Sequence, residues 1–229
     1  MKYKTDSGEL WLGDCLELMK EIPDGSVDMI LSDIPYDEVN QHSSGLRMLD
    51  RGNADTCNID LRVMVDESVR ICKGSFYIFC GTEQISELIG HFKRHGLTTR
   101  LCVWEKSNPS PMNGTRLWIS GMEFCVFARK PNATFNEHCQ KALWKAPVGT
   151  AKRHPTEKPL KLIERIVLAS SNKGDAVLDF TMGSGTTCVA AHNKGRLFIG
   201  IEKDEGYFEI AKKRIEEAVE TNNLEGFFE

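Results

Sequence analysis

The sequence predicts an α/β protein whose mostly parallel sheet is covered by helices on both faces. Short apolar runs alternate along the chain with segments in which apolar residues have helical spacing. Two of the apolar runs end in an acid, at Asp33 and Glu202, and a third leads into a glycine-rich turn at 181–187. Such alternation is typical of parallel sheets with helical crossovers. The length of 229 residues suits a single domain over residues 1–229.

The first half of the chain is expected to supply three strands and three helices. Apolar runs predict strands at 9–13, 27–33 and 75–80, and helical spacing predicts helices at 15–22, 61–72 and 83–95. The first helix is expected to end where Pro23 and Gly25 break it. Residues 37–58 are polar and rich in Gly, Asn and Asp, which predicts a long, mobile loop.

The second half continues the alternation. Strands are expected at 100–106, 122–129, 176–180 and 197–202, and helices at 158–171, 188–193 and 205–219. Pro159 lies in the first turn of its helix, where a proline is tolerated. Residues 107–121 are rich in Pro, Gly and Asn, and 131–158 is polar, so both are expected to be irregular.

Composition indicates a soluble protein of a reducing compartment. Hydrophobic residues make up 41% of the chain, and no apolar stretch approaches the roughly 20 residues of a membrane span. The first residues lack the apolar segment of a signal peptide, so a cytoplasmic location without membrane contact is expected. The eight cysteines form no C-x-x-C pair and no zinc-type spacing, which predicts free thiols and no metal site.

Charge is distributed unevenly along the chain. The net charge is −4, yet residues 91–153 hold eleven Lys and Arg against three Glu, a net charge of +8. A basic region on an acidic protein is what a polyanion-binding face would look like. A solvated, lysine-rich surface explains the same numbers, and charge alone does not decide between them.

The glycine-rich turn has the pattern of a nucleotide-binding loop. Gly183 and Gly185 lie between a strand and a helix start, where backbone can approach a ligand and free N–H groups are available. Glu202 ends the next strand, as does the acid that binds ribose hydroxyls in such folds. The turn lacks the lysine of a phosphate-binding P-loop, and Cys188 replaces the third small residue of a dinucleotide fingerprint. An adenosine-containing ligand is expected, although a turn needed only for chain reversal would look similar.

The segment Asp33-Ile34-Pro35-Tyr36 follows a buried strand. Ligands of open α/β sheets bind at such strand ends. A strand-terminating Asp with a packed Tyr is the ordinary explanation of so short a motif. The segment therefore indicates a function only in combination with other motifs of the sequence.

Four ordered motifs carry a resemblance to a known family. DIPY resembles the D-P-P-Y signature of DNA amino-methyltransferases, and VLDFTMGSGTT resembles their F-x-G-x-G-T-T loop. RHPTEKP at 153–159 resembles their H-x-T-x-K-P segment, and GDCLELMKEIPDGSVDMILSDIPY resembles their N-terminal stretch. With the catalytic motif first and the glycine loop last, the chain resembles the permuted β-class of the N4/N6 site-specific DNA methyltransferases.

The resemblance implies the Rossmann-like fold of S-adenosylmethionine-dependent methyltransferases, circularly permuted. Joining the C-terminal helix to the N-terminus would restore the order of an unpermuted nucleotide-binding domain. The glycine-loop strand would then be followed by LFIGIE, ELWLGD and VDMILSD. Chain termini that lie close together make such a rearrangement tolerable.

The resemblance also implies the catalytic residues Asp33, Ile34, Pro35 and Tyr36. Asp33 and the backbone carbonyl of Ile34 would accept hydrogen bonds from an exocyclic amine, and Tyr36 would stack on a base flipped out of the duplex. Ile34 departs from the family pattern, in which Pro is usual. Because the acceptor is a backbone group, we expect activity to survive this change.

The cofactor implied is S-adenosyl-L-methionine. Its expected binding residues are Asp14, Thr156, Lys158, Phe180, Gly183, Ser184, Gly185, Thr186 and Glu202. Asp14 would contact the adenine of the cofactor, and it also suits the N-cap of the helix that follows.

The expected activity is methyl transfer to N6 of a flipped adenine in double-stranded DNA. Asp at the first motif position favours adenine N6 over cytosine N4 in this family. Residues 107–152 are expected to form a small target-recognition region, with 37–58 closing over the base. The alternatives are a cytosine N4 or RNA methyltransferase, a catalytically silent nucleic-acid-binding module and, less favoured, an NAD-dependent oxidoreductase. Family members are often dimers, so a homodimer is a further option that the sequence does not decide.

Overall fold

The structure is a computed structural model that describes residues 1–36, 59–111, 114–149 and 157–225. The expected mobile loop at 37–58 and the predicted cofactor residue Thr156 lie outside the described residues. The remaining predicted site residues all lie within them.

The centre of the molecule is one mixed sheet with the strand order β1-β2-β9-β8-β3-β4-β6-β5-β7. Its strands, in chain order, are β1 (Lys2–Thr5), β2 (Gly8–Leu12), β3 (Val27–Asp33), β4 (Cys72–Cys80), β5 (Thr98–Lys106), β6 (Met122–Arg129), β7 (Leu143–Ala146), β8 (Ala176–Asp179) and β9 (Leu197–Glu202). Strands β2, β9, β8, β3 and β4 run parallel. Strand β1 is antiparallel to β2, and β6 is antiparallel to both β4 and β5. The expected mostly parallel sheet is confirmed.

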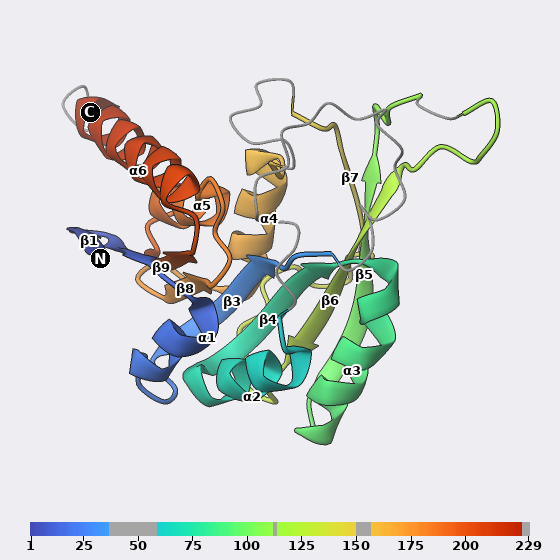
Figure 1. Cartoon of the computed structure of the whole chain (residues 1–229), viewed down its shortest axis with the longest axis horizontal. Coiled ribbons are helices and arrows are strands. Elements are labelled where there is room, and N and C mark those ends of the chain that lie inside the picture. Colours follow the sequence, from blue (N-terminus) through green and yellow to red (C-terminus); the bar gives the residue numbers. More distant parts are fainter. Residues whose placement is uncertain (37–58, 112–113, 150–156, 226–229) are drawn as a thin grey trace.

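Helices cover both faces of this sheet, as predicted (Figure 1). They are α1 (Cys15–Leu18), α2 (Leu61–Ile71), α3 (Ile85–Arg94), α4 (Leu160–Ser170), α5 (Thr186–Asn193) and α6 (Glu205–Glu225), with 3₁₀ turns at Met19–Glu21 and Thr82–Gln84. One buried cluster joins the sheet to α1, α2 and α3, with Met64 and Phe92 fully buried. The other joins it to α4, α5 and α6, with Val167 and Phe208 fully buried.

The strand order confirms the permuted arrangement. Strand β8 is central: β9 and then β2 lie on one side of it, and β3 and then β4 lie on the other. The chain therefore moves outward from β8 in both directions, which is the doubly wound pattern of nucleotide-binding sheets. The N-terminal strand β1 and the C-terminal helix α6 lie on the same side of the molecule (Figure 1), so joining the two ends would give the unpermuted order.

The elements differ from expectation mainly at the sheet edges. Strands β1 and β7 were not expected, because β1 has no buried residue and β7 buries only Trp144. The first helix is shorter than predicted, since α1 passes into a 3₁₀ turn at Met19. Helix α6 extends to Glu225, six residues beyond its predicted end. Among the described helices, none combines the length and apolar character needed to cross a membrane.

Candidate active site

The DIPY segment and the glycine-rich loop lie side by side at the carboxyl edge of the sheet. Strand β3 ends at Asp33 and pairs with β8, which ends at Asp179 directly before the loop. The strand order reverses between these two parallel strands, which makes this the topological switch point, where such sheets bind ligands in a crevice.

Two side-chain links fasten the two strand ends together. The Ser32 hydroxyl donates to Asp179 Oδ1 at 2.6 Å and accepts from the Phe180 backbone N–H at 3.0 Å. The Thr181 hydroxyl donates to the Asp33 carbonyl oxygen at 3.1 Å. The first residues of the loop are thereby held against the end of β3.

The Asp33 carboxylate is engaged at both oxygens. The Tyr36 hydroxyl donates to Oδ1 at 3.0 Å, and the Lys158 ammonium donates to Oδ2. Lys158 also lies 3.5 Å from the Tyr36 hydroxyl. The side chain of Asp33 is 29% exposed and that of Lys158 is 8% exposed, so the carboxylate borders the crevice and the ammonium lies behind it.

A second carboxylate lies behind the lysine. Glu123 Oε2 is 3.1 Å from Lys158 Nζ, and Glu123 Oε1 lies 2.7 Å from the Lys106 ammonium. Two ammonium groups and two carboxylates thus alternate in a chain that starts at Asp33. Alternating charges of this kind offset one another where water is scarce.

The shared charges shift the pKa values of the group. Burial raises the pKa of Asp33 above its usual value, and the adjacent Lys158 only partly offsets that effect. Burial acts to lower the pKa of Lys158, but the charges of Asp33, Tyr36 and Glu123 outweigh it and hold that pKa well above the usual value. Burial acts to raise the pKa of Glu123, and Lys158 and Lys106 together outweigh it and lower that pKa. Lys158 is therefore a permanent cation in this structure.

The turn after Asp33 keeps a backbone acceptor available. The Ile34 side chain is buried in the core, and its N–H donates to the Phe79 carbonyl at 3.1 Å. Gln84 Nε2 donates to the Pro35 carbonyl at 3.0 Å and so braces the turn. Within the described ranges, no donor reaches the carbonyl of Ile34. That Ile34 in place of the usual Pro still presents this oxygen to a substrate stays a prediction.

Glu202 is directed toward the glycine loop. Its Oε2 accepts from the Gly183 N–H at 2.8 Å, and its Oε1 accepts from the N–H groups of Lys203 and Asp204. Gly183 has φ of 51°, a conformation that favours glycine. Burial raises the pKa of Glu202 above its usual value. Glu202 and the glycine loop thus lie in contact, and the binding of ribose hydroxyls by Glu202 stays a prediction.

The rest of the loop is braced by Arg214 of α6. Its guanidinium donates to the Ser184 carbonyl and hydroxyl, both at 2.8 Å, and to the Thr186 hydroxyl at 3.1 Å. It also lies 2.6 Å from a carboxylate oxygen of Glu157. The side chains of Ser184 and Thr186 and the carbonyl of Ser184 therefore make contacts within the fold, and binding of a cofactor by this loop stays a prediction.

Gly185 has a packing role. It caps α5 with φ of 79°, and a Cβ there would lie 2.9 Å from the Cβ of Ala211 on α6. Glycine at this position therefore lets α6 approach the loop. Phe180 is 1% exposed, so its ring belongs to the core and only its backbone is available to a cofactor.

The remaining predicted residues differ in their setting. Asp14 caps α1, since its Oδ1 accepts from the Leu16 N–H at 3.0 Å. Its Oδ2 lies 3.6 Å from the Lys203 ammonium, beside the end of β9. Lys158, predicted to bind the cofactor, contacts the Asp33 carboxylate, and its contact with a cofactor stays a prediction. The N-cap role of Asp14 is confirmed, and its contact with the cofactor stays a prediction.

Sequence reasoning missed four residues of the site: Lys106, Glu123, Gln84 and Arg214. Lys106 and Glu123 read as ordinary polar positions at the ends of two strands. Glu123 contacts both Lys106 and Lys158 only because β5, β6 and the segment before α4 meet at the same edge. The missed signal was that Glu123 and Lys106 both border the carboxyl edge of the sheet.

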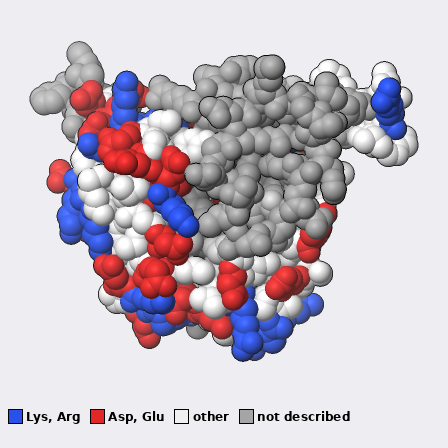
Figure 2. Space-filling view, in the orientation of Figure 1, with Lys and Arg blue, Asp and Glu red and all other residues white. Residues whose placement is uncertain are grey.

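The basic segment 91–153 does not form one continuous face in the part of the chain that is described. Arg129 pairs in the ladder with Thr98 at the amino edge of the sheet, whereas Arg116 lies in the loop beyond its carboxyl edge. Lys145 lies 3.2 Å from Glu105 and is partly neutralised. Figure 2 shows Lys and Arg mixed with Asp and Glu over the lower part of the visible surface. The charge is therefore divided between the two edges.

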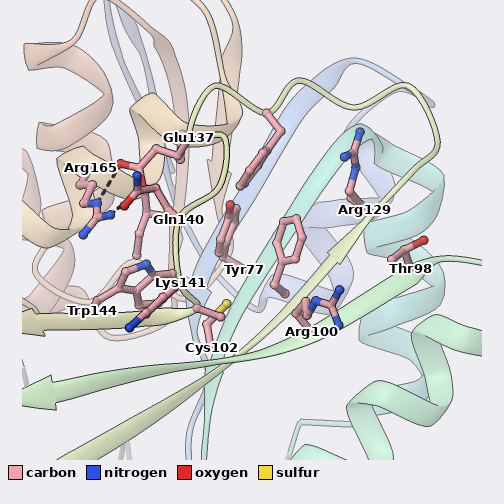
Figure 3. Close-up of a pocket in the computed structure, with 15 residues that line it drawn as sticks. Tyr77, Thr98, Arg100, Cys102, Arg129, Glu137, Gln140, Lys141, Trp144 and Arg165 are labelled. Carbon is pink, nitrogen blue, oxygen red and sulfur yellow. Dashed lines mark hydrogen bonds and ion pairs between the residues drawn. The ribbon is translucent and has the colours of Figure 1, made fainter.

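A second hollow lies apart from this edge, against α4. Its volume is about 360 Å³, and its walls include the aromatic side chains of Tyr77, Phe127, Phe135 and Trp144. Figure 3 shows the Arg165 guanidinium turned toward Glu137, to which it donates at 2.8 and 2.7 Å. The hollow extends to Thr98 at the amino edge, so it is separate from the Asp33 crevice.

Comparison with known proteins identifies relatives of this chain. The family model described as DNA methylase, for N6 and N4 methyltransferases, matches residues 27–213. The type II methyltransferase M2.DpnII of Streptococcus pneumoniae is 30% identical, over 96% of this chain and 94% of its own. M2.MboI of Moraxella bovis is 29% identical, over 91% and 87%.

Solved structures agree with the fold. The M1.HpyAVI complex with S-adenosylmethionine superposes with a TM-score of 0.73 at 30% identity, covering 91% of this chain and 98% of that one. The cytosine-N4-specific PvuII DNA methyltransferase has a TM-score of 0.70 at 18% identity, covering 93% and 87%, a likeness of fold alone. The chain therefore belongs to the DNA methylase family of N6 and N4 methyltransferases.

Proposed function

We propose that this protein transfers a methyl group from S-adenosylmethionine to N6 of an adenine flipped out of duplex DNA. The observation that carries the proposal is the pair of acceptors at the end of β3, the Asp33 carboxylate and the Ile34 carbonyl, fastened beside the glycine loop through Ser32 and Thr181. The relatives M2.DpnII and M2.MboI are type II methyltransferases, which supports action on DNA.

The residues at the glycine loop fit the proposed cofactor. Gly183 and the Glu202 carboxylate face one another across 2.8 Å, and Asp14 lies beyond them next to Lys203. Glu202 would accept from ribose hydroxyls, Asp14 from the adenine amine, and the backbone of Gly183 to Gly185 would border the ligand. When bound, the cofactor supplies an electrophilic methyl group on a sulfonium.

The hydrogen-bond acceptors at Asp33 and Ile34 would activate the substrate amine, which is otherwise a weak nucleophile. The lone pair of an exocyclic amine is delocalised into the ring, so the amine is a weak nucleophile. Hydrogen bonds from its two N–H groups to the Asp33 carboxylate and the Ile34 carbonyl favour a pyramidal nitrogen with a localised lone pair. The localised lone pair would then face the methyl group that the cofactor supplies when bound, and the proton that the nitrogen loses would pass to solvent. Positioning supplies most of the rate enhancement.

The adenine has to leave the duplex, because its amine is inaccessible while the base is stacked. Tyr36 is held at the crevice by its hydroxyl contact with Asp33 and by the braced turn at Pro35. Its ring would stack on the flipped base. Residues 37–58, which follow Tyr36 directly, are proposed to close over it.

Residues 107–152 are proposed to recognise the DNA target. The loop between β5 and β6 projects from the carboxyl edge, and its tip exposes three consecutive apolar side chains, with Leu117 68%, Trp118 100% and Ile119 46% exposed (Figure 1). Apolar side chains of this kind insert between base steps, and aromatic rings stack on bases. The exposed Arg116 beside them suits a phosphate.

The base of this loop is fixed, which would hold the tip in a defined place. The Lys106 N–H donates to the Gly121 carbonyl at 2.7 Å. Asn108 accepts from the Val148 N–H at 2.6 Å and donates to the Val148 carbonyl at 3.2 Å. The recognition loop is therefore tied to the segment after β7.

Labelled S-adenosylmethionine and unmethylated duplex DNA test the function. After digestion, label in N6-methyladenine is the expected result. Label in N4-methylcytosine would show that the substrate is cytosine, and label found only in RNA offered in parallel would show that it is RNA. No label in any of these would indicate a catalytically silent nucleic-acid-binding module.

A homodimer in the cytoplasm is also proposed. Sedimentation at the mass of one chain would contradict the dimer.

A further inference from the structure

The Lys158 ammonium lies between two carboxylates that compete for it. It donates to Asp33 Oδ2, and it is 3.1 Å from Glu123 Oε2. An ammonium has three N–H donors on a flexible stem, so it can redirect a donor without moving its backbone.

The competition matters because both carboxylate oxygens of Asp33 already accept hydrogen bonds in this structure. Oδ1 accepts from Tyr36 at 3.0 Å, and Oδ2 accepts from Lys158. A carboxylate whose negative charge is already shared with an ammonium is a weaker acceptor for an incoming amine. The proposed reaction needs that acceptor at full strength, so the lysine has to give up Oδ2 at least in part.

Glu123 provides an alternative hydrogen-bond acceptor for the lysine. Its Oε1 is taken by Lys106 at 2.7 Å. Its Oε2 is buried, and among the described residues it has no hydrogen-bond partner, since the nearby ammonium lies at 3.1 Å without the alignment of a hydrogen bond. A buried carboxylate oxygen without a hydrogen bond is costly, so a donor directed to it would be stabilised.

We propose that Glu123 is a positioning residue for methyl transfer, which draws the Lys158 ammonium away from Asp33 Oδ2 when the substrate amine arrives. The amine N–H then takes the place of the lysine N–H on Oδ2, and the lysine N–H takes up Glu123 Oε2. No charge leaves the buried group, and no hydrogen bond is lost. This inference rests on the proposed function, because it needs an amine substrate at Asp33.

Glu123→Gln tests the proposal. The substitution keeps the size and an oxygen for Lys106 or Lys158, but it removes the negative charge that attracts the lysine. The single-turnover rate of adenine methylation is expected to fall roughly 10- to 100-fold, the effect of losing a hydrogen bond to a charged group. The affinities for S-adenosylmethionine and for duplex DNA are expected to stay within about twofold of the parent, because Glu123 Oε2 is buried and touches neither.

Glu164→Gln is the matched control. Glu164 is also a poorly exposed glutamate paired with a lysine, at 3.2 Å from Lys194, but it lies on α4 away from Asp33. Its variant is expected to methylate at the parent rate. Thermal unfolding of both variants measures any general loss of stability, and a Glu123→Gln protein that binds both ligands normally is folded at the site.

Lys158→Gln separates positioning from a structural role. If Glu123 acts through the lysine, then adding Glu123→Gln to Lys158→Gln should slow transfer by less than threefold beyond Lys158→Gln alone. A parent rate for Glu123→Gln, or the same slowing with and without Lys158, overturns the proposal while leaving the function intact. A parent protein that methylates neither adenine nor cytosine overturns both.

Discussion

The Ser32 hydroxyl donates to Asp179 Oδ1 over 2.6 Å, and this hydrogen bond joins the strand that ends in the catalytic motif to the strand that leads into the glycine loop. Both residues are buried, with exposures of 1% and 4%. The Ser32 oxygen also accepts from the backbone N–H groups of Phe180 and Thr181 at 3.0 and 3.2 Å. One hydroxyl therefore satisfies two buried donors and one buried acceptor at the switch point of the sheet.

Ser32→Ala is expected to destabilise the fold by about 1–3 kcal/mol, since it removes the acceptor of the buried Phe180 N–H and one donor to the buried Asp179 carboxylate. Urea unfolding measures the change in free energy. Ser26→Ala is the control, because the Ser26 hydroxyl also donates a hydrogen bond, to the Pro23 carbonyl, but on an exposed turn. Its cost is expected to stay below about 0.5 kcal/mol. Equal costs for the two variants would show that the hydroxyl at β3 is not a structural link.

Asp179 is expected to make stability depend on pH. Burial raises the pKa of its carboxyl to about 6, above the usual value of 3.8. Between about pH 4 and pH 6, the folded protein therefore binds more protons at this residue than the unfolded chain does, and its contribution to stability falls as pH rises. Asp179→Asn keeps an oxygen to accept from Ser32 and removes the titration.

The measurement is urea unfolding of the parent and Asp179→Asn at several pH values. Relative to the parent, Asp179→Asn should become more stable as pH increases from 4 to 7. A difference in unfolding free energy that stays constant over this range would contradict the raised pKa.

Asp33→Ala is expected to reduce methyl transfer by on the order of 100-fold or more, because it removes the acceptor that localises the amine lone pair. Binding of S-adenosylmethionine should persist, since the glycine loop and Glu202 do not contact the Asp33 carboxylate in this structure. Transfer is measured with labelled cofactor, and binding is measured by calorimetry. Loss of cofactor binding would mean that the role of Asp33 has been misassigned.

The sequence predicted the interior of this fold better than its edges. Strands β3 and β9 were recognised because both are mainly apolar runs that end in an acid. Strands β1 and β7 were missed because an edge strand needs few buried residues, and KYKT has none. The local pattern of apolar residues indicates which segments are buried. An edge strand forms by pairing with a neighbouring strand, and the pattern of the edge segment itself does not show that neighbour.

The site shows the same division. Asp33 and Glu202 were predictable from their positions at strand ends, because chain direction alone places such ends together. Glu123 and Lys158 meet through tertiary packing, and neither position carries a local signal of that contact. Lys158 was assigned to the cofactor by resemblance, which gave no indication that its ammonium contacts the Asp33 carboxylate.

Trp118→Ala is expected to weaken binding of duplex DNA roughly tenfold, because stacking of one base on an aromatic side chain contributes about 1–3 kcal/mol. Affinity for S-adenosylmethionine should not change. Leu168→Ala is the control, since Leu168 is an exposed apolar residue, 42% accessible, on α4. Fluorescence anisotropy with labelled duplex measures the affinity. Equal affinities for both variants and the parent would remove Trp118 from the interface.

Arg214→Lys is expected to weaken cofactor binding about tenfold while leaving the fold intact. The guanidinium contacts Ser184, Thr186 and Glu157 at once, which the single ammonium of lysine cannot reproduce. Because these contacts hold the backbone of the glycine loop in place, their loss should loosen the surface proposed to border the cofactor. Lys213→Ala is the control, as Lys213 is the exposed neighbour on the same helix. Calorimetry with S-adenosylmethionine measures the affinities, and parent-like binding by Arg214→Lys would show that the loop keeps its shape without this brace.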